Sequence, residues 1–167
     1  MVFQSFIMSN FTYCPLVWHF CGKTNTAKIE KIQERALRII YKDFDSTYET
    51  LLAQSNLTTL FISRIRTMLL EVYKCVRSFN PEYLNKIFKI KKTGYFLRNE
   101  VILHLPVPKT TNFCLRSFSY AGAKLWNDQK FSVNVDDDCD YISREITLFK
   151  TFIKTHEVNL DVNFNFM

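Results

Sequence analysis

Apolar residues recur at helical spacing through one stretch in the middle of the chain. Between residues 62 and 79 they are separated by alternating steps of three and four, as Ile62, Ile65, Leu69, Val72, Val76 and Phe79. This spacing places all of them on one side of an α-helix, and the Asn80-Pro81 pair that follows is typical of a helix end. The stretch therefore predicts one long amphipathic helix.

Similar patterns predict further helices on both sides of this stretch. Residues 3–11 have helical spacing and stop before Pro15. A second helix is expected from Thr26, a plausible N-cap, to about Lys42. Its predicted apolar face consists of Ile29, Ile32, Ala36, Ile39 and Ile40. Ser46-Thr47-Tyr48-Glu49 has the form of a capping box and precedes a short helix that opens with Leu51 and Leu52. Residues 82–88, 117–127 and 142–156 are expected to form shorter helical segments.

The second half of the chain contains an interruption. Residues 93–111 include Gly94, Pro106 and Pro108, and they are expected to be an extended strand or loop. The predicted fold class is mainly α, a small helical bundle with this one extended interruption. Three regions are expected to pack as one compact unit: a helical region with a basic helix (1–92), an extended segment plus a short helix (93–130), and an acidic loop with a C-terminal helix (131–167).

Composition excludes several classes of enzyme. The chain has only three glycines in 167 residues, and they are too far apart for a phosphate-binding loop or a dinucleotide fingerprint. No G-x-S-x-G motif is present, and His19, His104 and His156 have no evident carboxylate to orient them. We therefore expect no catalytic residues and no enzymatic activity from this chain alone.

Two groups of residues have some features of a metal site. Cys14, His19 and Cys21 offer three ligands, whereas a structural zinc site needs four, normally as two well-spaced pairs. Asp136-Asp137-Asp138 is an acidic cluster, but magnesium-dependent polymerase chemistry needs carboxylates held on a tight hairpin and a distant strand. We predict buried small residues in the first case and an acidic solvent loop in the second. No metal and no cofactor are expected in this chain.

The cysteines and the uncharged N-terminus bear on the cellular compartment. Five scattered cysteines lack the spacing of a disulfide framework, which indicates reduced thiols in an intracellular protein. Residues 1–22 carry no charged side chain and are long enough to suggest a membrane span. Polar residues and Pro15 interrupt them, however, and favour a buried helix followed by a turn. No membrane association is therefore expected.

The best candidate for a binding site lies on the second predicted helix. Its cations are spaced three and four residues apart and fall on one helical face; we call them the basic row: Lys28, Lys31, Arg35, Arg38 and Lys42. Glu34 lies one turn before Arg38 and should weaken it slightly. In a chain of net charge +6, such a row fits a nucleic-acid phosphate backbone. It equally fits the solvated face of a bundle helix, and the sequence leaves both interpretations open.

Several short motifs together resemble a known family. Tyr13-Cys14 followed by Trp18 fits "Y-C-x-x-x-W", and Lys28–Arg38 fits "K-I-E-x-I-Q-x-R-A-L-R". Further on, Arg98, Pro106–Thr110 and Phe118–Asn127 resemble a region that closes in "L-W-N". In this order the motifs are similar to the C-terminal part of the reverse transcriptase, an RNA-directed DNA polymerase, of jockey-like non-LTR (LINE-type) retrotransposons. The resemblance covers about residues 5–156, although Asp128-Gln129 stands where the family has Leu-Pro.

The resemblance implies a role without catalysis. The family enzyme uses two magnesium ions held by a "Y/F-x-D-D" hairpin in its palm. Tyr41-Lys42-Asp43-Phe44-Asp45 is not that motif, because its acids are not adjacent. Fingers and palm would lie upstream of Met1, so the chain is expected to be an accessory fragment that contacts RNA or DNA through phosphates, in the nucleus and cytoplasm. The alternative is a helical protein-interaction remnant with no nucleic-acid role; the oligomeric state is left open.

Overall fold

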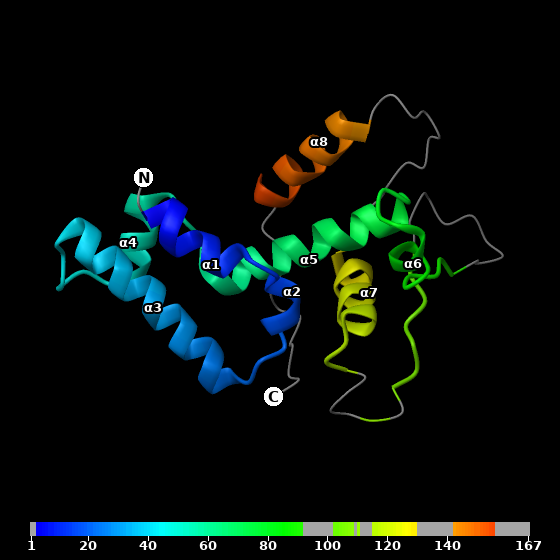
Figure 1. Cartoon of the computed structure of the whole chain (residues 1–167), viewed down its shortest axis with the longest axis horizontal. Helices are drawn as coiled ribbons and strands as arrows, with labels where there is room; N and C mark the ends of the chain where they lie inside the picture. The colour runs from blue at the N-terminus through cyan, green and yellow to red at the C-terminus, as the bar shows by residue number, and fades with distance from the viewer. Residues whose placement is uncertain (1–2, 92–101, 109, 111–114, 130–141, 156–167) are drawn as a thin grey trace. The chain divides into compact units, whose positions relative to one another are not determined.

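The computed structural model describes residues 3–91, 102–108, 110, 115–129 and 142–155. Within these ranges the chain forms eight α-helices, one π-helical turn and a single isolated β-bridge (Figure 1). The predicted mainly α fold class is confirmed. The chain divides into two compact units, Met1–Thr67 and Met68–Phe166, and the boundary lies within α5 (Leu60–Val76).

The first unit begins with three short segments and one long helix. They are η1 (Phe3–Met8), α1 (Ser9–Thr12), α2 (Pro15–Trp18) and α3 (Lys23–Tyr41). The N-cap of α3 is Gly22, whose carbonyl oxygen accepts the N–H groups of Asn25 and Thr26 at 2.9 and 3.0 Å. The expected N-cap at Thr26 is therefore wrong, because Thr26 already lies within the first turn.

The core of the first unit forms between α3 and α4 (Tyr48–Ser55). Leu37 of α3 is buried against Leu51 and Leu52 of α4. The capping box predicted before α4 is wrong: Thr47 is the N-cap, and it makes no side-chain capping bond. Ser46 is drawn into the preceding turn instead, where its N–H binds the Asp43 carboxylate at 3.0 Å.

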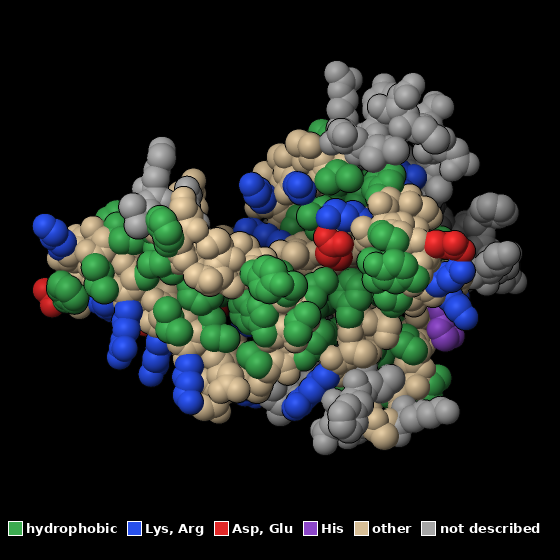
Figure 2. Space-filling view, viewed as in Figure 1, with side chains coloured by type: hydrophobic (Ala, Val, Ile, Leu, Met, Phe, Trp, Pro, Cys, Tyr) green, Lys and Arg blue, Asp and Glu red, His purple; other side chains and the backbone are tan. Residues whose placement is uncertain are grey.

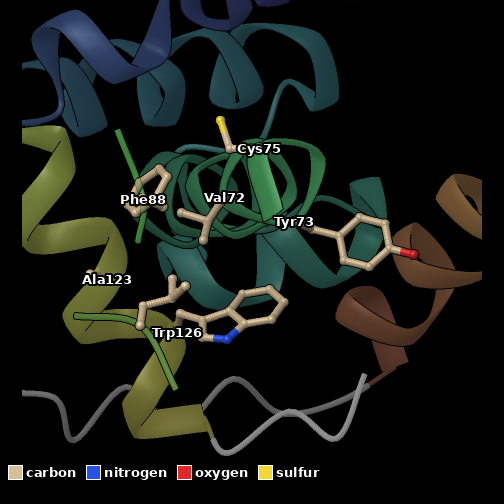
Figure 3. Packing of buried hydrophobic residues seen from close by; sticks show 7 residues of the cluster. Val72, Tyr73, Cys75, Phe88, Ala123 and Trp126 are labelled. Atoms are coloured by element: carbon tan, nitrogen blue, oxygen red, sulfur yellow. The ribbon is translucent and has the colours of Figure 1, made fainter. Parts of the chain in front are cut away.

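The second unit contains the C-terminal part of α5, α6 (Glu82–Asn85), α7 (Phe118–Gln129) and α8 (Ile142–Thr155). Its core gathers around α5 and α7, as Figure 3 shows, with these buried members: Val72, Tyr73, Cys75, Phe88, Leu103, Ala123 and Trp126. The Tyr73 ring stacks on Phe149 of α8 with 4.0 Å between centroids. Ile65, Leu69 and Val72 are fully buried along α5, which confirms the face predicted from their spacing.

The close approach of α7 to α5 requires glycine at position 122. A Cβ atom added there would lie 2.8 Å from a Val72 methyl carbon and 3.1 Å from the Phe88 ring. Such distances are shorter than normal van der Waals contact, so a larger residue would force the helices to shift. The glycine thus lowers helix propensity but permits the dense packing of the second unit.

The described part of the extended segment, residues 102–108, is held by one side chain of α7. Leu103 forms the β-bridge with Ile90, while Asn127 binds its other edge through two hydrogen bonds of 2.9 Å. The amide oxygen accepts the Leu103 N–H, and the amide nitrogen donates to the Leu103 carbonyl. Asn127 thereby takes the place of a neighbouring strand. Residues 93–101 and the predicted acidic loop with Asp136–Asp138 lie outside the described residues.

Candidate nucleic-acid interface

The orientation of α3 depends on a carboxylate that reaches a neighbouring helix. Glu30 accepts the backbone N–H groups of Leu60 at 3.2 Å and Phe61 at 2.8 Å, at the first turn of α5. The first N–H groups of a helix have no partner within it, and they favour a negative charge. Glu30 thus caps α5 from α3 and fixes which side of α3 faces inward.

The half-buried Tyr48 and the fully buried Gln33 complete this inward face. The Tyr48 hydroxyl lies 3.0 Å from the Glu30 carboxylate and 2.9 Å from the amide oxygen of Gln33. Burial, together with the negative charge of Glu30, raises the pKa of Tyr48, so the hydroxyl keeps its proton and remains a donor. Gln33 is fully buried and donates to the Thr58 carbonyl at 3.4 Å.

These polar contacts overturn the predicted apolar face of α3. The buried residues are Gln33 and Leu37, whereas Ile32 is 53% exposed and Ile39 is 68% exposed. The prediction was wrong because it ranked residues by apolar character alone. Glu30, Gln33 and Leu37 share one side of the helix, and their contacts with α4 and α5 turn Ile32 and Ile39 toward solvent.

The basic row lies on the side of α3 that faces away from this core. Arg35 is two positions from both Gln33 and Leu37, which corresponds to about 160° around a helix axis. Four members of the row are exposed: Lys28, Lys31, Arg35 and Lys42. In the part of the chain that the structure describes, none of these four forms an ion pair. Figure 2 shows Lys and Arg side chains projecting along the edge of the molecule where α3 lies.

Arg38, the fifth member, is engaged within the protein. Its guanidinium forms an ion pair with Glu34 at 2.8 Å and donates a further hydrogen bond to the Phe44 carbonyl at 2.6 Å. Its side chain is only 22% exposed. Arg38 therefore connects α3 to the turn that follows it, and the four exposed cations are the members free to meet a ligand.

The three residues weighed as metal ligands have different surroundings. Cys14 is exposed, in a left-handed backbone conformation with φ 44°, whereas His19 is buried against the Phe20 and Phe61 rings. Cys21 lies 3.4 Å from the Thr26 hydroxyl. Among the described residues, no group of three or more His, Cys, Asp or Glu side chains is placed to share a metal ion.

The first unit also buries a cation, which sequence reasoning missed. Arg64 of α5 is 2% exposed, and its guanidinium lies 4.7 Å from the centre of the Trp18 ring. Its Nε donates to the Leu60 carbonyl at 3.2 Å, while burial lowers the pKa of the group. The Trp18 indole donates in turn to the Tyr13 carbonyl at 3.0 Å. The "Y-C-x-x-x-W" motif thus forms a local turn that places an aromatic face over Arg64.

The stability of the chain is expected to fall as His19 becomes protonated. Burial, aided by the nearby Arg64 charge, lowers the pKa of His19 to about 4, so the unfolded chain binds this proton more readily than the folded one. Stability contributed by neutral His19 is complete above the usual pKa of 6.5 and is lost as the pH falls toward 4. The expected loss from about pH 7 to about pH 5 is about 2 kcal/mol.

Denaturant unfolding of the wild type and of His19→Gln over this pH range measures the effect. The variant should show a smaller loss of unfolding free energy, because it has no group to protonate at this position. Equal losses in the two proteins would contradict the assignment of the pH dependence to His19.

Comparisons with known proteins add no family to these observations. No family model, curated protein or solved structure matches the chain. Among the described helices, none is both long and apolar enough to cross a bilayer. The geometry of α3 is therefore the main basis for a functional assignment.

Proposed function

We propose that the chain is a non-catalytic, nucleic-acid-binding segment that contacts RNA or DNA phosphates through the exposed cations of the basic row. The observation that carries the proposal is their placement: Lys28, Lys31, Arg35 and Lys42 point away from the buried face of α3, and none of them forms an ion pair with another described residue. Each phosphate that such a row neutralises releases counterions, which favours binding at moderate salt.

The resemblance to jockey-like reverse transcriptases gives this binding a context. In that context the chain is a C-terminal accessory segment that holds template or primer, and a palm elsewhere in the parent polymerase supplies the magnesium-dependent chemistry. The structure gives physical roles to residues of the shared motifs. Glu30 and Gln33 orient α3, Trp126 fills a core, and Asn127 holds the extended segment.

Neutralising two central cations of the row should weaken binding and reduce its dependence on salt. In Lys31→Gln/Arg35→Gln, the slope of log affinity against log salt should fall by about one to two, because two phosphate contacts are lost. The loss should be similar for different base sequences, since phosphates carry no sequence information. Fluorescence anisotropy titrations with labelled RNA and DNA at several salt concentrations measure both quantities.

A matched variant separates a local site from general attraction to a basic protein. Lys89→Gln/Lys91→Gln removes the same charge from two exposed positions of the second unit. Its salt slope should stay near that of the wild type. An equal reduction in both variants would contradict a site on α3, and a wild type without salt-dependent affinity for RNA, DNA or hybrid would contradict nucleic-acid binding altogether.

A protein-interaction role is the second candidate, and exposed apolar side chains near the N-terminus favour it. Phe6, Tyr13 and Val17 are each at least 70% exposed although they belong to a helical unit with its own core. Clusters of exposed large apolar residues are typical of protein interfaces. This candidate is preferred if the wild type shows no affinity for nucleic acid in the titrations above.

A further inference from the structure

The turn after α3 contains a phenylalanine that is exposed to solvent. α3 ends at Tyr41, Lys42 adopts a left-handed backbone conformation with φ 52°, and the chain then turns toward α4. Phe44 lies in this turn, and its side chain is 68% exposed. In such a position an aromatic ring contributes little to the free energy of folding, because most of its apolar surface remains in contact with water.

Hydrogen bonds fix the backbone that carries this ring. The Asp43 carboxylate accepts the N–H groups of Asp45 at 3.2 Å and Ser46 at 3.0 Å. Hydrogen bonds from the side chain and the backbone of Ser46 lower the pKa of Asp43. The Asp43 carboxylate therefore stays charged and continues to accept the hydrogen bonds that stabilise the turn. From the other side, Arg38 donates to the Phe44 carbonyl at 2.6 Å, and Glu34 orients Arg38. Phe44 is therefore presented by an ordered backbone.

The same contact brings the backbone of Phe44 close to the basic row. Arg38 belongs to that row and binds the Phe44 carbonyl, and Phe44 follows Lys42 by two residues in the chain. Ile32 and Ile39 lie between the exposed cations on the same face, because residues 28, 32, 35, 39 and 42 are four and three apart. One face of α3 thus combines cations and exposed aliphatic side chains, and an exposed aromatic ring lies in the turn that follows the helix.

We infer that this face takes single-stranded nucleic acid, with phosphates on the exposed cations and one base stacked on Phe44. The inference rests on the proposed function and names its ligand. Proteins that bind single strands combine a positive track with aromatic side chains on which bases stack. In a duplex the bases are already stacked within the double helix, so Phe44, Ile32 and Ile39 would contact only the sugar–phosphate backbone.

The charge around Phe44 supports a base, and not a phosphate, at that end of the row. Asp45, the next residue in the chain, is exposed and would repel a phosphate there, whereas an uncharged base face meets no such penalty. From Lys28 to Lys42 the row is about 21 Å long. This length corresponds to about six nucleotides of a stacked strand.

The test compares three labelled ligands of one length: a single strand of mixed sequence, the same strand built with abasic sites, and the duplex. Phe44→Ala should weaken binding of the single strand about tenfold, the loss typical of one stacked base. Binding of the abasic strand and of the duplex should stay unchanged, because neither offers a free base. Phe44→Leu, which keeps an apolar side chain without a π-face, should behave like Phe44→Ala.

A control variant removes an equally exposed aromatic from the second unit. Tyr83 is 71% exposed, and Tyr83→Ala should leave the affinity for all three ligands unchanged. If Phe44→Ala weakens all three equally, or weakens none, the single-strand inference is overturned, although the salt-dependent phosphate contacts of the proposed function stand. If the wild type binds none of the three in a salt-dependent manner, the proposed function falls as well.

Discussion

Replacing Trp126 with alanine is expected to lower the free energy of unfolding by about 3–5 kcal/mol, as large truncations in cores do. The Trp126 side chain is 1% exposed and lies in the core of the second unit below Val72 (Figure 3). Its ring also lies 6.4 Å from Tyr73 and 6.2 Å from Phe149, centroid to centroid, so truncation removes contacts with both α5 and α8. Denaturant unfolding followed by far-ultraviolet circular dichroism measures the loss without depending on tryptophan fluorescence.

The matching control is Leu148→Ala on α8. The Leu148 side chain is 68% exposed, and its truncation should change the free energy of unfolding by no more than about 0.5 kcal/mol. Similar values for the two variants would mean that Trp126 is not a central member of the core.

The sequence predicted well the buried face of those helices in which one continuous stripe of apolar residues can be followed. In α5, α7 and α8 apolar residues recur at steps of three and four along such a stripe, although other apolar residues lie outside it. Burial of Leu69, Leu125 and Ile153 follows directly from this spacing. For such helices the hydrophobic effect alone decides which side faces inward, so a pattern of residue types contains enough information.

The orientation of α3 could not be predicted in this way. Its apolar residues lie on several sides, so no single side is clearly preferred. Glu30 and Gln33 determine the orientation of α3 through hydrogen bonds to residues 15 to 31 positions away along the chain. A hydrophobicity pattern counts both residues as polar and places them outside. The available signal was the motif "K-I-E-x-I-Q-x-R-A-L-R", in which Glu30 and Gln33 share a side with Leu37.

Only one part of the candidate site, the row of cations on α3, could be predicted from the sequence. The spacing of the basic row was sufficient to place Lys28, Lys31, Arg35 and Lys42 on one face, because helix geometry alone fixes their relation. The engagement of Arg38 and the presentation of Phe44 depend on a turn stabilised by the Asp43 carboxylate. Turn contacts of this kind follow from backbone geometry, which residue spacing does not contain.

Replacing Glu30 with alanine is expected to lower the free energy of unfolding by about 3 kcal/mol, because it removes charge-assisted hydrogen bonds from two backbone N–H groups. The same change takes one acceptor from the half-buried Tyr48 hydroxyl, which lies 3.0 Å from the carboxylate. Glu30→Gln keeps an acceptor oxygen without the charge and should lose less. Denaturant unfolding of both variants measures the two contributions.

Glu34→Ala provides the comparison, since it removes a carboxylate of the same helix whose hydrogen bonds, among the described residues, go to Arg38 alone. Partly exposed ion pairs within one helix contribute little, so this variant should lose no more than about 1 kcal/mol. If Glu30→Ala and Glu34→Ala are equally mild, the cap on α5 does not determine how α3 is oriented. A large loss confined to Glu30→Ala is the result expected if this one carboxylate holds α3 against α5, in the orientation that leaves the basic row exposed.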